Sequence, residues 1–137
     1  EPVWRECFRV LRPGGALLAA FMNPIVYVFD AEAEARGELT VRHRLPFADV
    51  VDRPPEDLER VIATDHTVEF SHTLEAQIGG QLRSGFRLTD LYEDVDRGPP
   101  ASGRSLYFPT CIATRAVKPP SPLWGGTGRG SGQGGER

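Results

Sequence analysis

The stretch that decides the fold is ECFRVLRPGGALLAAFMNP, residues 6–24. Its first part has the spacing of an amphipathic helix, which we expect to end at Pro13 because proline disfavours helical geometry at the residue before it. Gly14 and Gly15 then permit a sharp reversal of the chain. Residues 16–22 are all apolar and do not alternate with polar residues, which favours a strand covered on both faces of a sheet. Helix, tight turn and buried strand in this order are typical of a doubly wound α/β sheet, which binds ligands at the carboxyl ends of its strands.

The helix and turn resemble those of a known family, the class I S-adenosylmethionine-dependent methyltransferases. In that family a helix ending in R-x-L-[RK]-P-G-G leads into the fifth strand of the sheet. The matching residues of this chain are Arg9, Leu11, Arg12, Pro13, Gly14 and Gly15. Residues 73–92, TLEAQIGGQLRSGFRLTDLY, are similar to the last helix, a Gly-Phe turn and the sixth strand, and residues 109–119, PTCIATRAVKP, resemble the final antiparallel strand. The resemblance covers roughly residues 1–119.

The resemblance implies both a fold class and an activity. The chain would be the C-terminal portion of a Rossmann-like α/β sheet, strands 5 to 7 with helices and a lid insertion. The enzyme would transfer a methyl group from S-adenosyl-L-methionine to an acceptor. Residues 1–118 would form this part of the domain, with a substrate lid at about residues 24–70. Residues 119–137 are rich in Gly and Pro and are expected to be a disordered tail.

The cofactor-binding residues of such a fold cannot be identified in this chain. A glycine-rich loop after the first strand normally approaches the cofactor, and an acidic residue ending the second strand holds its ribose. Neither can be placed before residue 6, and the glycines of residues 126–135 match such loops only in spelling, because no apolar strand precedes them. We therefore expect a fragment that is inactive alone and whose partner is the missing N-terminal half of the same domain.

The expected lid contains local helix signals. Asp30 is expected to cap a short helix that ends near Gly37. Residues 39–45 alternate between apolar and polar side chains, as in a short strand or an extended segment. Pro54 and Pro55 precede another helix. We expect this helix to direct the side chains of Leu58, Val61 and Ile62 inward.

A further helix is expected to begin near Ser71 and to end at Gly85. Its apolar stripe consists of Phe70, Leu74, Ile78 and Leu82. Gly79 and Gly80 lie inside it, where each costs roughly 1 kcal/mol relative to alanine. Either the helix breaks there, or the missing side chains allow close approach by the sheet, a ligand or a second chain; we favour close packing. In the strand that follows, one face is expected to carry Phe86, Leu88, Asp90 and Tyr92.

The candidates for binding the acceptor substrate are Met22, Asn23, Tyr27, His72 and Glu93. His72 is the candidate for catalysis, because it would lie at the helix start beside the lid and could accept a proton from the acceptor. A structural or surface role there is the alternative. Methyl transfer requires mainly alignment of the reactants, so the catalytic residues stay unassigned.

Other polar residues carry less specific signals. Glu93 belongs to an acidic group with Asp94 and Asp96, which is either a rim of the acceptor site or a solvated turn. The histidines, His43, His66 and His72, lack the i, i+4 spacing of a zinc-binding pair, so no metal site is expected.

The composition of the chain limits the classes of partner that it is expected to bind. The 137 residues carry a net charge of −3 from 16 basic and 19 acidic residues, which argues against a nucleic-acid binder. The apolar run at residues 16–22 is too short to span a membrane. Cys7 and Cys111 lie in apolar patterns and are expected to be unpaired in a reducing, cytoplasmic compartment. The resemblance implies a small-molecule acceptor as the partner, and a small metabolite, a lipid-like ring and a protein side chain are all compatible with these residues.

An alternative function remains open. The chain could be a non-catalytic interaction module that uses the lid and the helix containing Gly79 and Gly80 to bind a partner, with the tail as a tether. As an isolated fragment, the strand at residues 16–22 would lack its neighbour from the N-terminal half and is expected to expose an unpaired, apolar edge, which predicts self-association.

Overall fold

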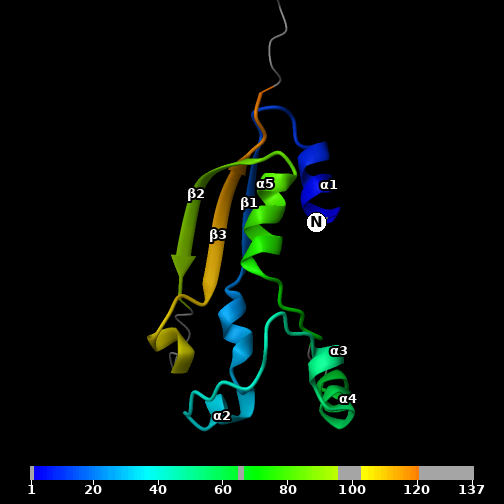
Figure 1. Cartoon of the computed structure of the whole chain (residues 1–137), viewed down its shortest axis with the longest axis vertical. Coiled ribbons are helices and arrows are strands. Elements are labelled where there is room, and N and C mark those ends of the chain that lie inside the picture. The colour runs from blue at the N-terminus through cyan, green and yellow to red at the C-terminus, as the bar shows by residue number, and fades with distance from the viewer. Residues whose placement is uncertain (1, 65–66, 96–102, 121–137) are drawn as a thin grey trace, which may run out of the picture.

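The computed structural model describes residues 2–64, 67–95 and 103–120. Its sheet contains β1 (Ala16–Met22), β2 (Arg87–Asp94) and β3 (Cys111–Val117) in the order β1-β3-β2. Because β3 pairs antiparallel with both neighbours, β1 and β2 run in the same direction and their carboxyl ends meet at one end of the sheet (Figure 1). The predicted mixed α/β portion of a sheet is confirmed. Asp96, His66 and the predicted disorder of residues 121–137 lie outside the described residues.

The expected helix, turn and strand are present at the start of the chain. Helix α1 (Pro2–Val10) is followed by a turn in which Gly14 has a φ of 79°. A Cβ atom at Gly15 would lie 2.8 Å from the carbonyl oxygen of Arg12, so a side chain is excluded there too. The ammonium group of Lys118 donates hydrogen bonds of 2.7 and 2.8 Å to the carbonyl oxygens of Phe8 and Leu11. A residue that directly follows β3, at the end of the sheet where β1 begins, thus caps the end of α1.

The helix that precedes β2 continues through its two glycines. It consists of a π-helical turn, η2 (Glu75–Gly79), followed by α5 (Gly80–Arg83). A Cβ atom at Gly80 would lie 2.5 Å from Cδ1 of Trp4, and the Trp4 indole donates a 3.0 Å hydrogen bond to the carbonyl oxygen of Ala76. The helix does not break, and close packing is confirmed at Gly80, but the group that approaches it is the indole of α1 and not the sheet, a ligand or a second chain; at Gly79 the nearest atom belongs to Arg83 of the same helix. Gly85, with a φ of 101°, follows the helix end as predicted.

The predicted apolar stripe of this helix does not face the sheet. Leu74 and Leu82 are 45% and 50% exposed, whereas Gln81 is fully buried and accepts a 3.0 Å hydrogen bond from the Thr114 hydroxyl of β3. The helix also begins at Leu74, later than Ser71. A π-helical turn contains an extra residue compared with an α-helical turn, so the side chains after it are rotated about the axis. That rotation brings Gln81 to the sheet.

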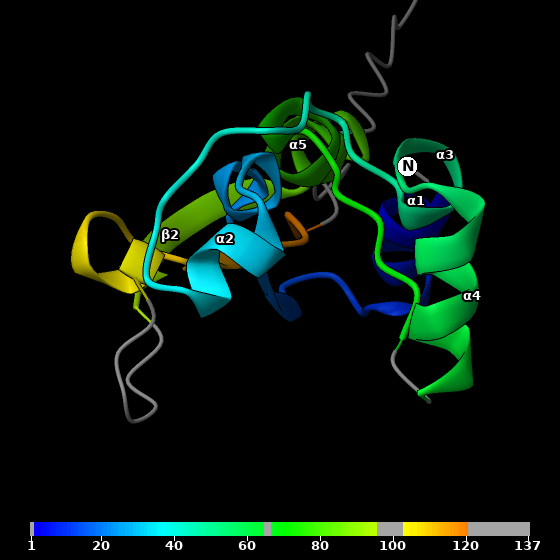
Figure 2. The same ribbon diagram turned by 90° about the horizontal axis from the view of Figure 1, so that it is seen from below.

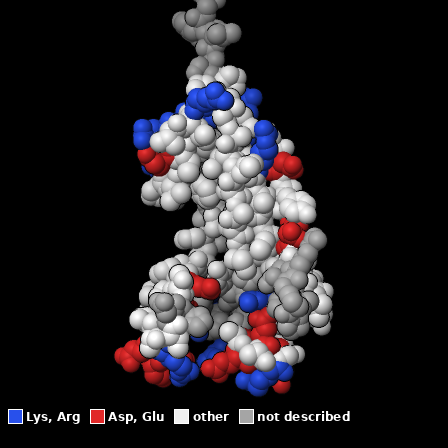
Figure 3. All heavy atoms as spheres, turned by 180° about the vertical axis from the view of Figure 1, so that it is seen from behind, with Lys and Arg blue, Asp and Glu red and all other residues white. Residues whose placement is uncertain are grey.

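Helix α5 covers one face of the sheet, and no described residue covers the other. On the α5 side, Ile112, Thr114 and Ala116 are buried. On the opposite side Leu18 is 75% exposed and Tyr92 is 60% exposed. Among the described residues the strand at residues 16–22 is therefore covered on one face, and its coverage on both faces in the whole domain stays a prediction. We call the uncovered surface the open sheet face; it occupies the largely uncharged middle of Figure 3.

Strand β2 contains an irregularity that the sequence pattern did not predict. Leu88 pairs with Ala116, but Asp90 pairs with Arg115, so the register shifts at Thr89. Leu88 therefore shares a face with the buried side of β3, whereas Asp90 and Tyr92 lie on the open sheet face. The predicted single face of Phe86, Leu88, Asp90 and Tyr92 is wrong beyond Thr89, because a bulge changes the two-residue alternation.

The segment between β1 and η2 lies beyond the carboxyl ends of β1 and β2 (Figure 1). Its elements are η1 (Pro24–Val28), α2 (Ala31–Ala35), α3 (Asp49–Asp52) and α4 (Pro55–Ala63), and η3 (Gly103–Leu106) follows β2. Seen from below, α2 lies apart from α3 and α4, and an extended segment joins α2 to α3 (Figure 2). We call residues 24–70 the insertion; its role as a lid stays a prediction.

Most local predictions within the insertion are confirmed. The Asp30 side chain caps α2, Gly37 has a φ of 84°, and α4 begins at Pro55. Residues 39–45 are extended, with a single bridge between Phe29 and Val41. Helix α3 was not predicted. Ile62 was expected to point inward but is 59% exposed, because the described residues provide no packing surface on that side of α4.

Candidate functional site

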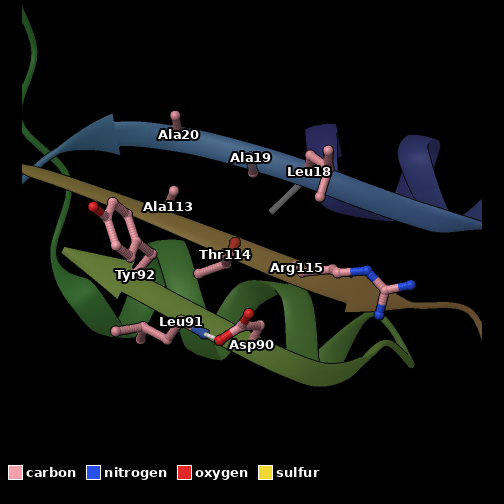
Figure 4. Close-up of a pocket in the computed structure, with 9 residues that line it drawn as sticks. All are labelled: Leu18, Ala19, Ala20, Asp90, Leu91, Tyr92, Ala113, Thr114 and Arg115. Carbon is pink, nitrogen blue, oxygen red and sulfur yellow. Dashed lines mark hydrogen bonds between the residues drawn. The ribbon is translucent and has the colours of Figure 1, made fainter. Parts of the chain in front are cut away.

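A shallow hollow of about 320 Å³ lies on the open sheet face (Figure 4). Leu18, Ala20, Ala113 and Tyr92 contribute to its lining, which is mainly apolar. A sheet of an α/β domain normally buries such a face under another layer. We therefore interpret this hollow as a packing surface rather than as a catalytic site.

A smaller cavity, of about 110 Å³, lies within the insertion, beyond the carboxyl end of β1. We call it the insertion cavity. Its lining includes Tyr27, Phe29, Asp30, Glu32, Arg42, His43, Phe47, Arg53, Asp57, Glu69 and Arg104. It combines aromatic rings with titratable groups at the end of the sheet where α/β folds bind ligands, so we take it as the candidate site.

Asn23 connects the sheet to the cavity. Its backbone N–H donates a 2.8 Å hydrogen bond to the carbonyl oxygen of Thr110, and its side-chain amide donates a 3.0 Å hydrogen bond to that of Pro109. The amide oxygen accepts a 3.3 Å hydrogen bond from the N–H of Ile25 and caps η1. Asn23 thereby fixes the start of the helix that carries Tyr27.

Aromatic rings form the inner wall of the insertion cavity. Phe47 is 4% exposed and lies at its centre. The ring of Tyr27 stacks on it with centroids 6.1 Å apart, and the ring of His43 lies 4.8 Å from it in a tilted arrangement. The N–H of Phe47 donates a 2.6 Å hydrogen bond to the hydroxyl of Ser71, which joins this wall to the segment before η2.

The buried carboxylate of Asp49 binds two other residues of the cavity lining, Arg53 and Glu69. Asp49 is 1% exposed, and its oxygens accept hydrogen bonds from Nε of Arg53 and, at 2.9 Å, from the N–H of Glu69. The guanidinium carbon of Arg53 lies 5.9 Å from the centroid of the Phe47 ring. A buried charge of this kind is stable only when it is paired and hydrogen-bonded, so this contact defines the local geometry.

The arginines at the cavity are already paired with carboxylates. Arg53 pairs with Asp49, and Arg42 lies 2.7 Å from an oxygen of Asp30. Hydrogen bonds from the N–H of Ala33 and from Arg42 hold the pKa of the Asp30 carboxyl below its ordinary value. Nε of Arg104 lies 3.1 Å from the Glu34 carboxylate, and its Nη1 donates a 2.7 Å hydrogen bond to the carbonyl oxygen of Val26. These paired cations offer little free positive charge to a ligand.

Two carboxylates of the cavity lining, unlike the arginines, are not paired with a residue of opposite charge in the part of the chain that the structure describes. Neither Glu32 nor Glu69 has an ion pair among the described residues. Burial, followed by the negative charge of Glu69, raises the pKa of the Tyr27 phenol. The phenol therefore stays protonated at neutral pH and can donate a hydrogen bond to a ligand.

The structure does not bring the sequence-predicted site residues together. Tyr27 lines the insertion cavity. Met22 lies at the end of β1, 42% exposed, with its sulfur 3.8 Å from that of Cys111. Asn23 makes the structural contacts described above. His72 is exposed and lies just before η2, and Glu93 is exposed on β2.

The sequence interpretation did not single out His43, Phe47 or Glu69 as ligand contacts. His43 and Phe47 belong to an extended segment without helical periodicity, and the contact that Glu69 makes with Asp49 joins residues that are 20 positions apart in the sequence. Their shared location depends on long-range folding, so no local signal could have grouped them.

The described residues show no metal site and no membrane-spanning helix. No group of three or more His, Cys, Asp or Glu there could hold a metal ion. None of the helices described is long and apolar enough to cross a membrane. The glycines with positive φ, Gly14, Gly37 and Gly85, do not directly follow the carboxyl end of a strand. The described residues therefore do not fit the glycine-rich cradle that binds S-adenosylmethionine in this fold.

The topology of the sheet resembles part of a known fold. Two parallel strands, an antiparallel strand between them and a site at the shared carboxyl end fit a part of a class I S-adenosylmethionine-dependent methyltransferase domain. The chain matches an S-adenosylmethionine-dependent methyltransferase of known structure from Mesorhizobium loti with a TM-score of 0.55. The two are 20% identical, and the match covers 85% of this chain and 54% of the other, which supports the fold alone.

A relative in sequence makes the assignment more specific. The chain is 43% identical over 119 residues to the uncharacterized methyltransferase YbaJ of Bacillus subtilis (strain 168). That match covers 85% of this chain but 44% of YbaJ, so the chain spans less than half the length of this relative. No protein-family model matches the chain. The chain is thus related to the methyltransferases and corresponds to one part of such a protein.

Proposed function

We propose that this chain forms the acceptor-binding part of an S-adenosylmethionine-dependent methyltransferase and that its acceptor is a small molecule. The observation that carries the proposal is the insertion cavity, with its aromatic wall, at the shared carboxyl end of β1 and β2. Segments of the domain that lie N-terminal to those described here would bind the cofactor, which supplies an electrophilic methyl group.

The residues of this chain would orient the acceptor and handle its proton. Alignment of the nucleophile accounts for much of the catalysis in such a transfer, and a rigid aromatic wall serves this purpose. Tyr27 is the sequence-predicted candidate that lines the cavity, and we propose it as an acceptor contact. His43 also lines the cavity, whereas His72 does not, so we propose His43 as the group that accepts a proton.

Calorimetric titration with S-adenosylmethionine tests this division of roles. We expect no binding to this chain and clear binding to a chain extended at its amino end by the sequence encoded upstream. The matched titrant is methionine, which lacks the adenosyl group and should bind neither chain. Absence of cofactor binding by the extended chain would contradict the proposal.

The alternative of a non-catalytic interaction module receives less support. In that alternative, the helix containing Gly79 and Gly80 is the surface that binds a partner. Trp4 of the same chain, however, already occupies the space at Gly80. A partner could not approach that glycine without displacing the indole. Restored cofactor binding in the extended chain would exclude the alternative.

A further inference from the structure

We propose that the insertion cavity recognises a small organic cation, a molecule that carries a protonated amine, through the Glu69 carboxylate and the ring of Tyr27. This inference rests on the proposed function, because it specifies the chemical class of the acceptor. It also predicts a binding event that this chain performs without any cofactor.

The charge distribution is the first reason. Each arginine of the lining is neutralised by a carboxylate, through the pairs Arg42–Asp30, Arg53–Asp49 and Arg104–Glu34. Asp57 is paired as well, 3.1 Å from Arg60. Glu32 and Glu69 form no ion pair among the described residues. Although Glu32 lies in the field of Arg42, Glu69 has no cation beside it in that part of the chain, so the field at Glu69 favours a positive ligand over a negative one.

The aromatic wall is the second reason. The face of an aromatic ring attracts a cation, and Phe47 already has the guanidinium of Arg53 over its ring. Tyr27 is half-buried, and its hydroxyl has no hydrogen-bond partner in the part of the chain that the structure describes. The Tyr27 ring and the Glu69 carboxylate line the same cavity and can contact one ammonium group together.

The size of the cavity limits what enters it. A volume of about 110 Å³ is below the range of roughly 300–1,000 Å³ that encloses a drug-sized ligand. We therefore infer that a cationic head group enters and that the rest of the ligand stays outside. A protonated amine has no free lone pair to receive a methyl group. The anchoring cation and the methyl-accepting atom are then different atoms of the acceptor.

Probes of equal shape and different charge test this proposal. We expect benzylammonium to bind the full 137-residue chain, with benzyl alcohol at least three-fold weaker and benzoate not detectably bound. Titrations followed by two-dimensional amide NMR should shift the signals of Phe47 and Glu69. Tighter binding of benzoate than of benzylammonium would overturn the proposal, because it would show that the arginines recruit an anion. Absence of benzylammonium binding would overturn it as well.

Variants identify the residues responsible. Glu69→Gln removes an exposed charge and should weaken benzylammonium binding by about three-fold, a typical effect for an exposed ion pair. Tyr27→Leu should weaken it by a similar factor through loss of the ring face. Glu59→Gln, an exposed substitution on α4 outside the lining, is the matched control and should change nothing. Equal binding by the wild type, Glu69→Gln and Tyr27→Leu would contradict the assignment.

These outcomes are independent of the test of the proposed function. Amine binding is measured without S-adenosylmethionine, so its failure leaves cofactor binding by the extended chain unaffected. Conversely, if the extended chain fails to bind the cofactor while the amine still binds, methyl transfer is rejected and the cation site remains.

Discussion

Gly80 is required by the position of Trp4. The indole lies where a Cβ atom would be, 2.5 Å from Cδ1, and is itself held by its hydrogen bond to Ala76. Gly79, one residue earlier, has a different neighbour, because a Cβ atom there would lie 2.9 Å from Nη1 of Arg83. That guanidinium ends a flexible side chain that is 47% exposed, so it can move away.

Alanine substitutions at these glycines should therefore have opposite effects. Gly80→Ala should destabilise the fold by about 1–2 kcal/mol, because overpacking exceeds the gain in helix propensity. Gly79→Ala, its matched control, should be neutral or stabilising by up to about 1 kcal/mol. Urea unfolding followed by circular dichroism measures both changes. Equal stabilisation by the two substitutions would show that Trp4 does not constrain Gly80.

At the scale of elements, Lys118 connects α1 to the sheet. Its ammonium group donates to two carbonyl oxygens at the end of the helix and lies 4.6 Å from the centroid of the Phe8 ring. Its backbone bonds both glycines of the turn: its N–H donates to the oxygen of Gly15 at 2.9 Å, and its oxygen accepts from Gly14 at 2.8 Å. The turn and the end of β3 are thus one structural unit.

Removal of this ammonium group should weaken the attachment of α1. Lys118→Met keeps most of the aliphatic length but leaves the carbonyl oxygens of Phe8 and Leu11 without their donor, so we expect a loss of about 1–3 kcal/mol of stability. Arg87→Met, an exposed charge removal where β2 pairs with Val117, should stay within about 0.5 kcal/mol. Thermal unfolding compares the two variants. A loss no larger for Lys118→Met than for Arg87→Met would contradict the capping role.

The elements that could be predicted from the sequence are those whose structure is determined by residues adjacent in the chain. The strand at residues 16–22, the cap at Asp30 and the helix stop at Gly85 each depend on a few adjacent residues. The side of a helix or strand that faces the core was predicted less well. The π-helical turn at η2 and the shift at Thr89 alter periodicity, and neither has a signal in a single sequence.

The candidate site depends even more on long-range contacts. Tyr27 could be proposed because it follows the strand whose carboxyl end was identified. Phe47 and Glu69 could not, because their location is set by Ser71 and by the buried Asp49. A pattern of apolar and polar residues does not predict which carboxylate is buried, since burial depends on a distant arginine and backbone donor.

For the whole molecule, the open sheet face and the outer edge of β1 are the exposed apolar surfaces of the sheet. One edge of β1 pairs with β3, and its other edge pairs with no strand among the described residues. Leu18 projects from the open sheet face. An unpaired, apolar edge is a template for association with another chain. The self-association predicted from the sequence therefore has a structural basis.

A charge on this surface should reduce association. We expect the chain to form dimers or larger species at tens of micromolar concentration, and Leu18→Lys to shift it toward the monomer by electrostatic repulsion. Val51→Lys introduces the same charge at a residue that is 78% exposed on α3, and should leave association unchanged. Sedimentation velocity distinguishes the species. A wild-type chain that stays monomeric throughout, or an equal effect of Val51→Lys, would contradict this prediction.

The register shift at Thr89 has a consequence for how related sequences should be aligned. Because β2 has one residue more than β3 at this point, the loss of one residue there would remove the irregularity and leave the later pairs, such as Tyr92 with Ala113, unchanged. Tyr92 and the carboxylate of Asp90 would stay on the open sheet face, and Leu91 would stay on the side of α5. A one-residue gap at this place in a homologue therefore signals a regular strand with the same two faces, not a rebuilt sheet surface.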